Sequence, residues 1–524
     1  MAGGGSEDDL ISYTWAVEMY LSGAWVDVSA DVRQVAPVAL SRGIDGTNIT
    51  DRVAKVGTLS FALDNSTGNS TATLGYYSPD HASVRTGFGL GTLTRLSIVY
   101  SATTYYKFYG KISDVTPLAG AYKERYVSVM CVDFMNELLV HNMNKVAVQV
   151  NKRGNQLLTT IVANLPTAPL ATSYATGPDV FAYALHDIQD EKTSAMNAVQ
   201  RVDQSGLSYT FVAGDLTGGE TLKWQTRHSR LLLTANSVFS NSMTGLTVKR
   251  KADSIYNTIK ATGYPLTLGT TNEVLWTSRK EMVIEAAATL TLAVRFTDPS
   301  GAGKRVAVIP GTEVTPVSDT DYKMSSLPAN GGNDLNASLG ITVTWGGNTA
   351  SAALVDNAAV TGYINLFQLR GKIIRLNDPA EVVKTDATSK TAHGDRTLTF
   401  ALPYLDSINT ITAFATELLA RLKDPVTAIE SLEFVANTNA TLMAAAMDSD
   451  VGYRTTLTET VTGFSADDFF INSYDLIIEP GKLTCKFGNL EPAGLTANIG
   501  IWGTNAGDSG DWGTVAGDSS RWVF

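Results

Sequence analysis

Apolar and polar positions alternate through most of the first quarter of the chain. Between Tyr13 and Asp133 the prevailing period is two, which is the period of a strand with one buried face. The alternation is clearest in two runs: Leu59, Phe61 and Leu63, and then Leu96, Ile98 and Tyr100. The pattern breaks between Ser101 and Thr104 as it does at a turn, and it resumes at Tyr106. Residues 13–133 are therefore predicted to form an N-terminal β domain, preceded by a flexible segment, 1–12.

Helical spacing appears next. Asp133 is a candidate N-cap for a helix from Phe134 to Asn142. Two further helices are predicted from apolar positions three and four residues apart: Leu157, Leu158, Ile161, Val162 and Leu165, and then Ala195, Met196, Val199 and Val202. We expect Gly206 to end the second of these in the left-handed conformation, because glycine adopts it without steric cost. Residues 134–245 are predicted as a small α/β module.

Strand patterns return in the second half of the chain. Residues 246–400 are predicted as a β domain with an insertion at about 300–350, and Thr289 to Phe296 alternate. Residues 401–490 are predicted as a helix followed by a C-terminal β domain. The helix has one apolar face and stops before Asp424 and Pro425; the face contains Ile411, Phe414, Ala415, Leu418, Leu419 and Leu422.

A ten-residue repeat occupies the end of the chain, 491–524. It places Trp502, Trp512 and Trp522 at equal spacing among glycines and small polar residues. Two copies are too few to stack into a core of their own. Tryptophan side chains dominate interfaces when they enter pockets, so these three are candidate docking residues. Packing against the parent domain is the alternative.

Composition supports a β-rich, multidomain protein of the α+β type. The chain has 524 residues, which exceeds one hydrophobic core, and 44% of them are hydrophobic. Only 17% are charged, and the abundance of small polar residues favours strands and turns over long surface helices. Cys131 and Cys485 lie in strand patterns and are predicted to be buried free thiols.

The charge balance argues against stable binding to nucleic acid. The formal net charge is -11, from 51 acidic and 40 basic residues, and no run of Lys and Arg could neutralise a row of phosphates. No stretch reaches the ~18 apolar residues of a membrane-spanning helix. The acidic N-terminus also lacks the pattern of a secretory signal, so we expect no membrane-spanning segment and no secretion.

Candidate catalytic motifs are weak. Gly507 to Gly510 includes Ser509 in a sequence similar to a serine-protease nucleophile loop, and His393 is the candidate histidine. The chain between His393 and Ser509 is too short to build the double barrel that would bring a Ser-His-Asp site together. The glycines from Gly87 to Gly91 lead into a strand and not into a helix, so they do not form a phosphate loop. We expect no enzyme activity and no cofactor.

Metal and acid–base sites receive no better support. No two of the five histidines have the three- or four-residue spacing that puts two ligands on one helix face. Asp508, Asp511 and Asp518 lie among glycines, but their spacing is not that of an EF-hand. Acid pairs such as Asp467 with Asp468, or Asp187 with Asp190, are interpreted as surface acids because sequence alone does not fix their separation.

The chain resembles the N-terminal domain of phage minor tail proteins at Val38 to Asn65. There a strand ending in Ser-Arg-Gly is followed by a Gly-Thr-led strand ending in Asp-Asn. The resemblance continues in order along most of the chain, through the following segments: Gly110, Val127 to Leu139, Ala195 to Phe211, Thr226 to Arg230, Val294 to Pro299, Leu369 to Ile374 and Leu418 to Pro425.

The resemblance implies a tail-tip or baseplate hub protein of a long-tailed bacteriophage. Such proteins have β-barrel-like domains, act usually as trimers in the virion tail tip, and assemble in the host bacterial cytoplasm. The implied partners are the distal tail ring protein, the tape measure protein, and receptor-binding or central fibre proteins, with DNA passing through without specific binding. A long C-terminal peptidase or lysozyme-like extension is lacking, so cell-wall degradation is not expected of this chain.

Two other functions stay open from the sequence. One is a receptor-binding tail adhesin that recognises a host surface glycan through its β modules and its Trp-rich end. The other is an enzyme that acts on peptidoglycan, with an acid such as Asp467 in its site.

Overall fold

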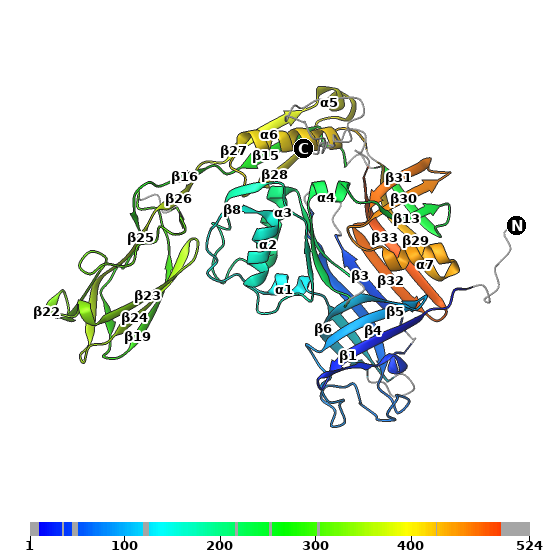
Figure 1. The fold of residues 1–524 in the computed structure, drawn as a ribbon, viewed down its shortest axis with the longest axis horizontal. Helices are drawn as coiled ribbons and strands as arrows, with labels where there is room; N and C mark the ends of the chain where they lie inside the picture. Colours follow the sequence, from blue (N-terminus) through cyan, green and yellow to red (C-terminus); the bar gives the residue numbers. More distant parts are fainter. Residues whose placement is uncertain are drawn as a thin grey trace, which may run out of the picture.

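One large sheet forms the body of the molecule. The computed structural model describes residues 10–33, 36–44, 51–118, 125–214, 218–250, 254–300, 304–425 and 427–493. Fourteen strands make up this sheet, in the order β13-β30-β31-β33-β32-β3-β4-β7-β6-β5-β1-β2, with β29 joining β33 to β14. Figure 1 shows it running from the blue strands at the bottom to the orange strands at the right.

The bounds of the fourteen strands are β1 Thr14–Leu21, β2 Ala24–Asp27, β3 Val38–Gly43, β4 Lys55–Asp64, β5 Leu93–Tyr100, β6 Thr103–Leu118, β7 Tyr126–Val132, β13 Ala235–Ser240, β14 Gly245–Arg250, β29 Thr427–Val435, β30 Arg454–Glu459, β31 Phe464–Phe470, β32 Ser473–Glu479 and β33 Lys482–Pro492.

Strands from both ends of the chain are neighbours in this sheet. Strand β3, from the N-terminal part of the chain, pairs with β4 on one side. On its other side it pairs with β32, from the C-terminal part of the chain, and Leu40 lies opposite Leu476. Both leucines are 1% exposed and belong to the main hydrophobic core. Burial of such side chains stabilises the fold by about 1.5–3 kcal/mol each, so the sheet is held from both ends of the sequence.

Seven α-helices lie in the described ranges: α1 Met135–Val140, α2 Gly154–Ala163, α3 Ala195–Gly206, α4 Arg227–Leu231, α5 Ala387–His393, α6 Ile408–Leu422 and α7 Ala440–Asp448. The first three pack together with two small sheets in the centre of Figure 1, where β8 pairs with β10, and β12 pairs with β9 and β11. These strands are β8 Gln149–Arg153, β9 Thr172–Tyr174, β10 Val180–Ala184, β11 Tyr209–Ala213 and β12 Thr221–Gln225.

Two nested insertions interrupt the large sheet. Strand β14 pairs with β29, so the chain between residues 250 and 427 leaves the sheet and returns beside its point of departure. Within this segment β15 (Thr258–Gly263) pairs with β27 (Ala380–Thr385) and β28 (Thr397–Leu402), and α6 packs on β15 and β27. Residues 264–379, here called the distal lobe, leave and return at the paired residues Gly263 and Ala380.

The distal lobe has a core of its own. Its apolar cluster includes Phe296, Phe367 and Ile364, all fully buried. The lobe extends to the left in Figure 1. Its strands are β16 Leu266–Leu268, β17 Glu273–Thr277, β18 Met282–Ile284, β19 Thr289–Arg295, β20 Ala307–Val308, β21 Tyr322–Leu327, β22 Gly331–Asp334, β23 Leu339–Trp345, β24 Thr349–Asp356, β25 Gly362–Gly371 and β26 Ile373–Leu376.

The β-rich, multidomain fold predicted from the sequence is confirmed. Barrel-like domains were expected, but within the described ranges the strand pairing follows an open path from β13 to β2 and no closed barrel is found. The domain limits stay a prediction, and the pairing shows that strands from several of the predicted domains share one sheet.

One predicted helix end is wrong. Gly206 is the last residue of α3, and Leu207 adopts the left-handed conformation in its place, with φ 49°. The Leu207 side chain is 6% exposed, so burial compensates the backbone strain that a glycine would have avoided. Cys131 and Cys485 are buried free thiols as predicted.

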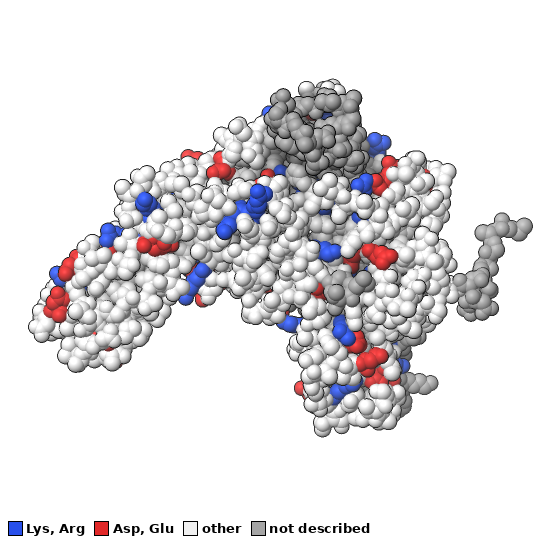
Figure 2. Space-filling view, viewed as in Figure 1, with Lys and Arg blue, Asp and Glu red and all other residues white. Residues whose placement is uncertain are grey.

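Surface charge is mixed on the face shown in Figure 2. Lys and Arg alternate with Asp and Glu there, and neither sign gathers into one broad patch. None of the helices in the described ranges is long and apolar enough to cross a membrane.

Candidate functional site

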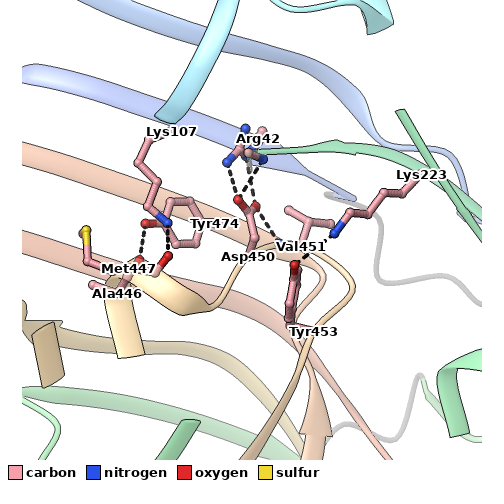
Figure 3. A network of polar contacts seen from close by, with 10 residues as sticks. Arg42, Lys107, Lys223, Ala446, Met447, Asp450, Val451, Tyr453 and Tyr474 are labelled. Carbon is pink, nitrogen blue, oxygen red and sulfur yellow. Dashed lines mark hydrogen bonds and ion pairs between the residues drawn. The ribbon is translucent and has the colours of Figure 1, made fainter. Parts of the chain in front are cut away.

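A cavity of about 610 Å³ opens where β6, β13 and the end of α7 meet. Its lining comes from parts of the chain that are far apart in sequence, and the lining residues used below are Tyr105, Lys107, Asn236, Asp448, Asp450 and Tyr453. Lys107, Asp450 and Tyr453 in its lining belong to a network of polar groups that joins the N-terminal strands, the α/β module and the C-terminal strands (Figure 3).

An ion pair between Arg42 and Asp450 is the centre of this network. Arg42 on β3 donates through Nε to Asp450 Oδ1 at 3.0 Å and through Nη2 to Oδ2. Both side chains are almost completely buried, with exposures of 2% and 4%. The backbone N–H groups of Gly214 and Val451 donate to the same carboxylate at 3.1 and 2.7 Å. Four donors therefore compensate the cost of burying this charge.

Gly214 is required by the close approach of three chain segments. A Cβ at this position would lie 2.8 Å from the carbonyl oxygen of Tyr106 and 2.9 Å from Nη2 of Arg42. Any side chain here would push the backbone away from the carboxylate of Asp450, which it contacts through its N–H. The absence of a side chain at Gly214 thus allows β6, β3 and the segment after β11 to approach this closely.

Lys107 and Tyr474 satisfy the carbonyl groups at the C-terminal end of α7. Lys107 Nζ donates to the carbonyl of Met447 at 2.7 Å, and the Tyr474 hydroxyl donates to the carbonyl of Ala446 at 2.8 Å. A cation is favourable at this end because the helix dipole is negative there. Burial lowers the pKa of Lys107 to about 8, against the opposing effect of Asp450. The ammonium thus acts as a helix cap.

A hydrogen bond also connects the α/β module to the loop after α7. Lys223 on β12 donates to the hydroxyl of Tyr453 at 3.0 Å, and its Nζ lies 4.5 Å from the centre of that ring. Tyr453 follows Asp450 by three residues and borders the cavity. The end of α7 and the loop after it are therefore held by contacts from β3, β6 and β12 (Figure 3).

A second polar cluster lies beside the end of α4. Arg52 and Arg230 both stack on the ring of Tyr209, with Cζ 4.7 and 3.8 Å from its centre. Glu491 accepts from the Tyr209 hydroxyl at 3.1 Å and from Arg230 at 3.2 Å. Burial alone would raise the pKa of Glu491, but the charges of Arg230 and Arg52 outweigh it and hold the pKa below its usual value. This cluster joins β33 to the α/β module.

The known proteins that resemble this chain in structure share little sequence with it. No protein-family model and no curated protein matches it. Its structural neighbours include tail proteins.

The 43 kDa tail protein of prophage MuSo2 from Shewanella oneidensis is 8% identical, with a TM-score of 0.47 over 92% of this chain and 99% of that one. The tail protein from Neisseria meningitidis MC58 is 9% identical, with a TM-score of 0.46 over 91% and 96%. The E. coli c3393 protein, a type VI secretion component with structural similarity to T4 tail proteins, is 11% identical, with a TM-score of 0.27 over 67% and 76%.

The acids that the sequence offered as candidate catalytic pairs mostly form hydrogen bonds and ion pairs within the protein. Asp187 accepts from Arg201 at 2.6 Å and from Tyr404 at 3.1 Å, while Asp190 accepts from the backbone of Lys145 at 2.8 Å. Asp468 pairs with Arg454, and its neighbour Asp467 is exposed. Three of the four candidate acids, Asp187, Asp190 and Asp468, therefore take part in contacts within the fold.

The other sequence candidates lie apart from the network. Gly87 and Gly91 form turns with φ 83° and 81° before β5, as predicted. Among the described residues, no three His, Cys, Asp or Glu side chains are grouped to hold a metal. Trp502, Trp512 and Trp522 lie outside the described residues, as do Asp508, Ser509, Asp511 and Asp518.

Sequence reasoning missed the network, although one signal was present. Val38, Leu40 and Arg42 fall on one face of a strand at a period of two, and all three are buried. An arginine on an apolar face requires a buried partner. Its partner, 408 positions later, could not be found from local pattern.

Proposed function

We propose that this chain is a structural hub protein of a phage tail tip, in the virion, where it joins the tail tube to the host-recognition apparatus and forms part of the DNA ejection conduit. The ordered sequence resemblance to phage minor tail proteins supports this proposal. Assembly in the host bacterial cytoplasm is consistent with the two buried free thiols.

The observation that carries the proposal is the continuous sheet built from both ends of the chain and fixed by the Arg42–Asp450 pair. Relative motion of the first and last strands would break buried hydrogen bonds, which makes this body stiff. A stiff unit suits a protein that must transmit force between a tube and its fibres. The cavity described above is bordered by structural contacts, and its lysine serves as a helix cap.

Mass measurement tests the hub assignment. A hub that closes around a tube is expected to form a ring, and a trimer is the expected symmetry. Native mass spectrometry of the purified chain, alone and mixed with the distal tail ring protein, should show a threefold species. A chain that stays monomeric in both samples would contradict the proposal.

The expected partners are the distal tail ring protein, the tape measure protein, and receptor-binding or central fibre proteins. Trp502, Trp512 and Trp522 are proposed to dock on one of them. Replacing all three by alanine should abolish co-assembly and leave the melting temperature unchanged. A lowered melting temperature with normal co-assembly would instead mean that the repeat packs on its own chain.

The acidic balance of the chain suits a conduit, because a negative lumen repels phosphates and lets DNA slide. An electrostatic map of the assembled ring tests this point. A neutral or basic lumen would contradict it.

A receptor-binding adhesin for a host surface glycan is the alternative. It predicts retention on host cells without ring formation, so cell-binding and mass measurements on the same preparation separate the two. An enzyme acting on peptidoglycan predicts clearing in a zymogram that is lost in Asp467→Asn, and we expect no clearing.

A further inference from the structure

The cavity beside the Arg42–Asp450 pair has the dimensions of a small-molecule site. Its volume of about 610 Å³ falls within the range of roughly 300–1,000 Å³ that is usual for ligand pockets. Helix α7, strand β6 and the Lys223–Tyr453 contact hold its walls. The site is therefore preformed.

The charges around the cavity disfavour an ionic ligand. Asp450 already accepts four hydrogen bonds, and Lys107 is bonded to the Met447 carbonyl. An anion would meet the exposed carboxylate of Asp448 at the rim, and a cation would meet the buried ammonium of Lys107. A neutral ligand avoids both repulsions.

The polar groups on the walls call for a ligand with several hydroxyl groups. The Asn236 side chain is exposed at the rim and offers an amide donor and acceptor, and Asp448 offers carboxylate oxygens.

The apolar part of the lining is aromatic. Tyr105 and Tyr453 both border the cavity and are half-buried. The Tyr105 hydroxyl interacts with Asp448, so its ring is held at the rim. Aromatic faces beside amide and carboxylate groups suit a molecule with one apolar face and a polar edge.

We propose that this cavity binds a neutral sugar unit, with Asn236 and Asp448 bonding its hydroxyl groups and Tyr105 and Tyr453 contacting its ring. The proposal goes beyond the hub function and does not rest on it. A hub of correct mass without sugar binding would refute only this inference, and a sugar-binding monomer would refute only the hub.

Calorimetric titration of the full chain with glucose, galactose, N-acetylglucosamine and rhamnose tests the site. At least one sugar should give saturable binding. Asn236→Ala and Asp448→Asn should each weaken that binding by about tenfold, the effect of one lost hydrogen bond at the upper end of its usual range. Both positions are exposed, so the variants should keep the melting temperature of the parent.

Asn333→Ala and Asp467→Asn are matched controls at exposed positions away from the cavity, on β22 and β31. They should bind the same sugar as the parent does. The inference is overturned if none of the four sugars saturates up to its solubility limit. It is equally overturned if binding occurs but is unchanged in the Asn236 and Asp448 variants, because the sugar then binds elsewhere.

Discussion

Arg42 and Asp450 show how a single buried pair can join distant parts of a chain. The pair is desolvated, and each partner exposes less than one twentieth of its side chain. A pair of this kind adds little net stability compared with an apolar packing, but removal of one partner leaves an uncompensated buried charge. The pair therefore disfavours any arrangement of the sheet in which Arg42 and Asp450 do not meet.

Asp450→Asn is expected to destabilise the protein by about 3–5 kcal/mol, because the Arg42 guanidinium would lose its counter-charge in a buried site. Urea unfolding measures the change. Asp468→Asn, which breaks the more exposed pair with Arg454, is the control and should cost about 1 kcal/mol or less. Equal losses in the two variants would contradict the interpretation.

The pH dependence of stability is expected to reflect Asp133 and Glu220. Burial raises the pKa of each to about 7, above the ordinary values of 3.8 and 4.5. The folded state therefore favours the protonated acids. This contribution is complete below about pH 4 and is lost as the pH rises towards 7.

Asp133→Asn and Glu220→Gln should flatten that decline, because each removes a titrating group and keeps an oxygen that accepts a hydrogen bond. Each shifted unit of pKa corresponds to about 1.4 kcal/mol. Unfolding measured at pH 5, 6 and 8 provides the comparison with the parent chain. Parallel stability curves for parent and variants would show that these acids do not cause the dependence.

At the level of elements, four of the seven α-helices in the described ranges, α1, α2, α3 and α6, were predicted from local sequence, whereas α4, α5 and α7 were not. Ser194, Asp386, Ser407 and Asn439 each accept a hydrogen bond from a backbone N–H as N-caps of α3, α5, α6 and α7. Asp133 likewise accepts from the N–H of Met135 at the start of α1, as predicted. The neighbour relation between β3 and β32 was not predictable, because an alternating pattern specifies a buried face and not a partner strand.

Substitutions in the turn between β5 and β6 are expected to stabilise the protein. Ser101 and Ala102 form a two-residue loop with φ 49° and 61°, a conformation that favours Asn and Gly. Both residues are exposed. The double variant Ser101→Asn with Ala102→Gly should raise the stability by about 1 kcal/mol in urea unfolding. The same change at Ser70 and Thr71, where no such φ occurs, should bring no gain.

The distal lobe is expected to be removable. Gly263 and Ala380 are paired neighbours, and the lobe has its own core, so a short glycine linker can replace residues 264–379. The shortened chain should keep the unfolding transition of the large sheet. Val148, which contacts lobe residues Ala307 and Ile374, would become exposed, and Val148→Thr should improve solubility of the shortened chain. Loss of the main transition would contradict the nested arrangement.

For the whole molecule, the charge distribution predicts no retention of DNA. The chain carries a formal charge of -11, and positive and negative groups are mixed on the face shown in Figure 2. A gel-shift assay with duplex DNA at about 50 mM salt should show no complex, because favourable release of counterions needs a row of basic contacts. A complex that dissociates as salt is raised would contradict this expectation and the conduit proposal with it.

The pairing of β3 with β32 also determines when the protein can finish folding during synthesis. Some 430 residues of chain must leave the ribosome between the two strands, as the register Leu40 to Leu476 requires. Until then, the free edge of β3 exposes a row of unpaired backbone groups that can pair with another chain. Translation that stops before residue 473 would therefore yield fragments that lack β32 and aggregate through this free edge.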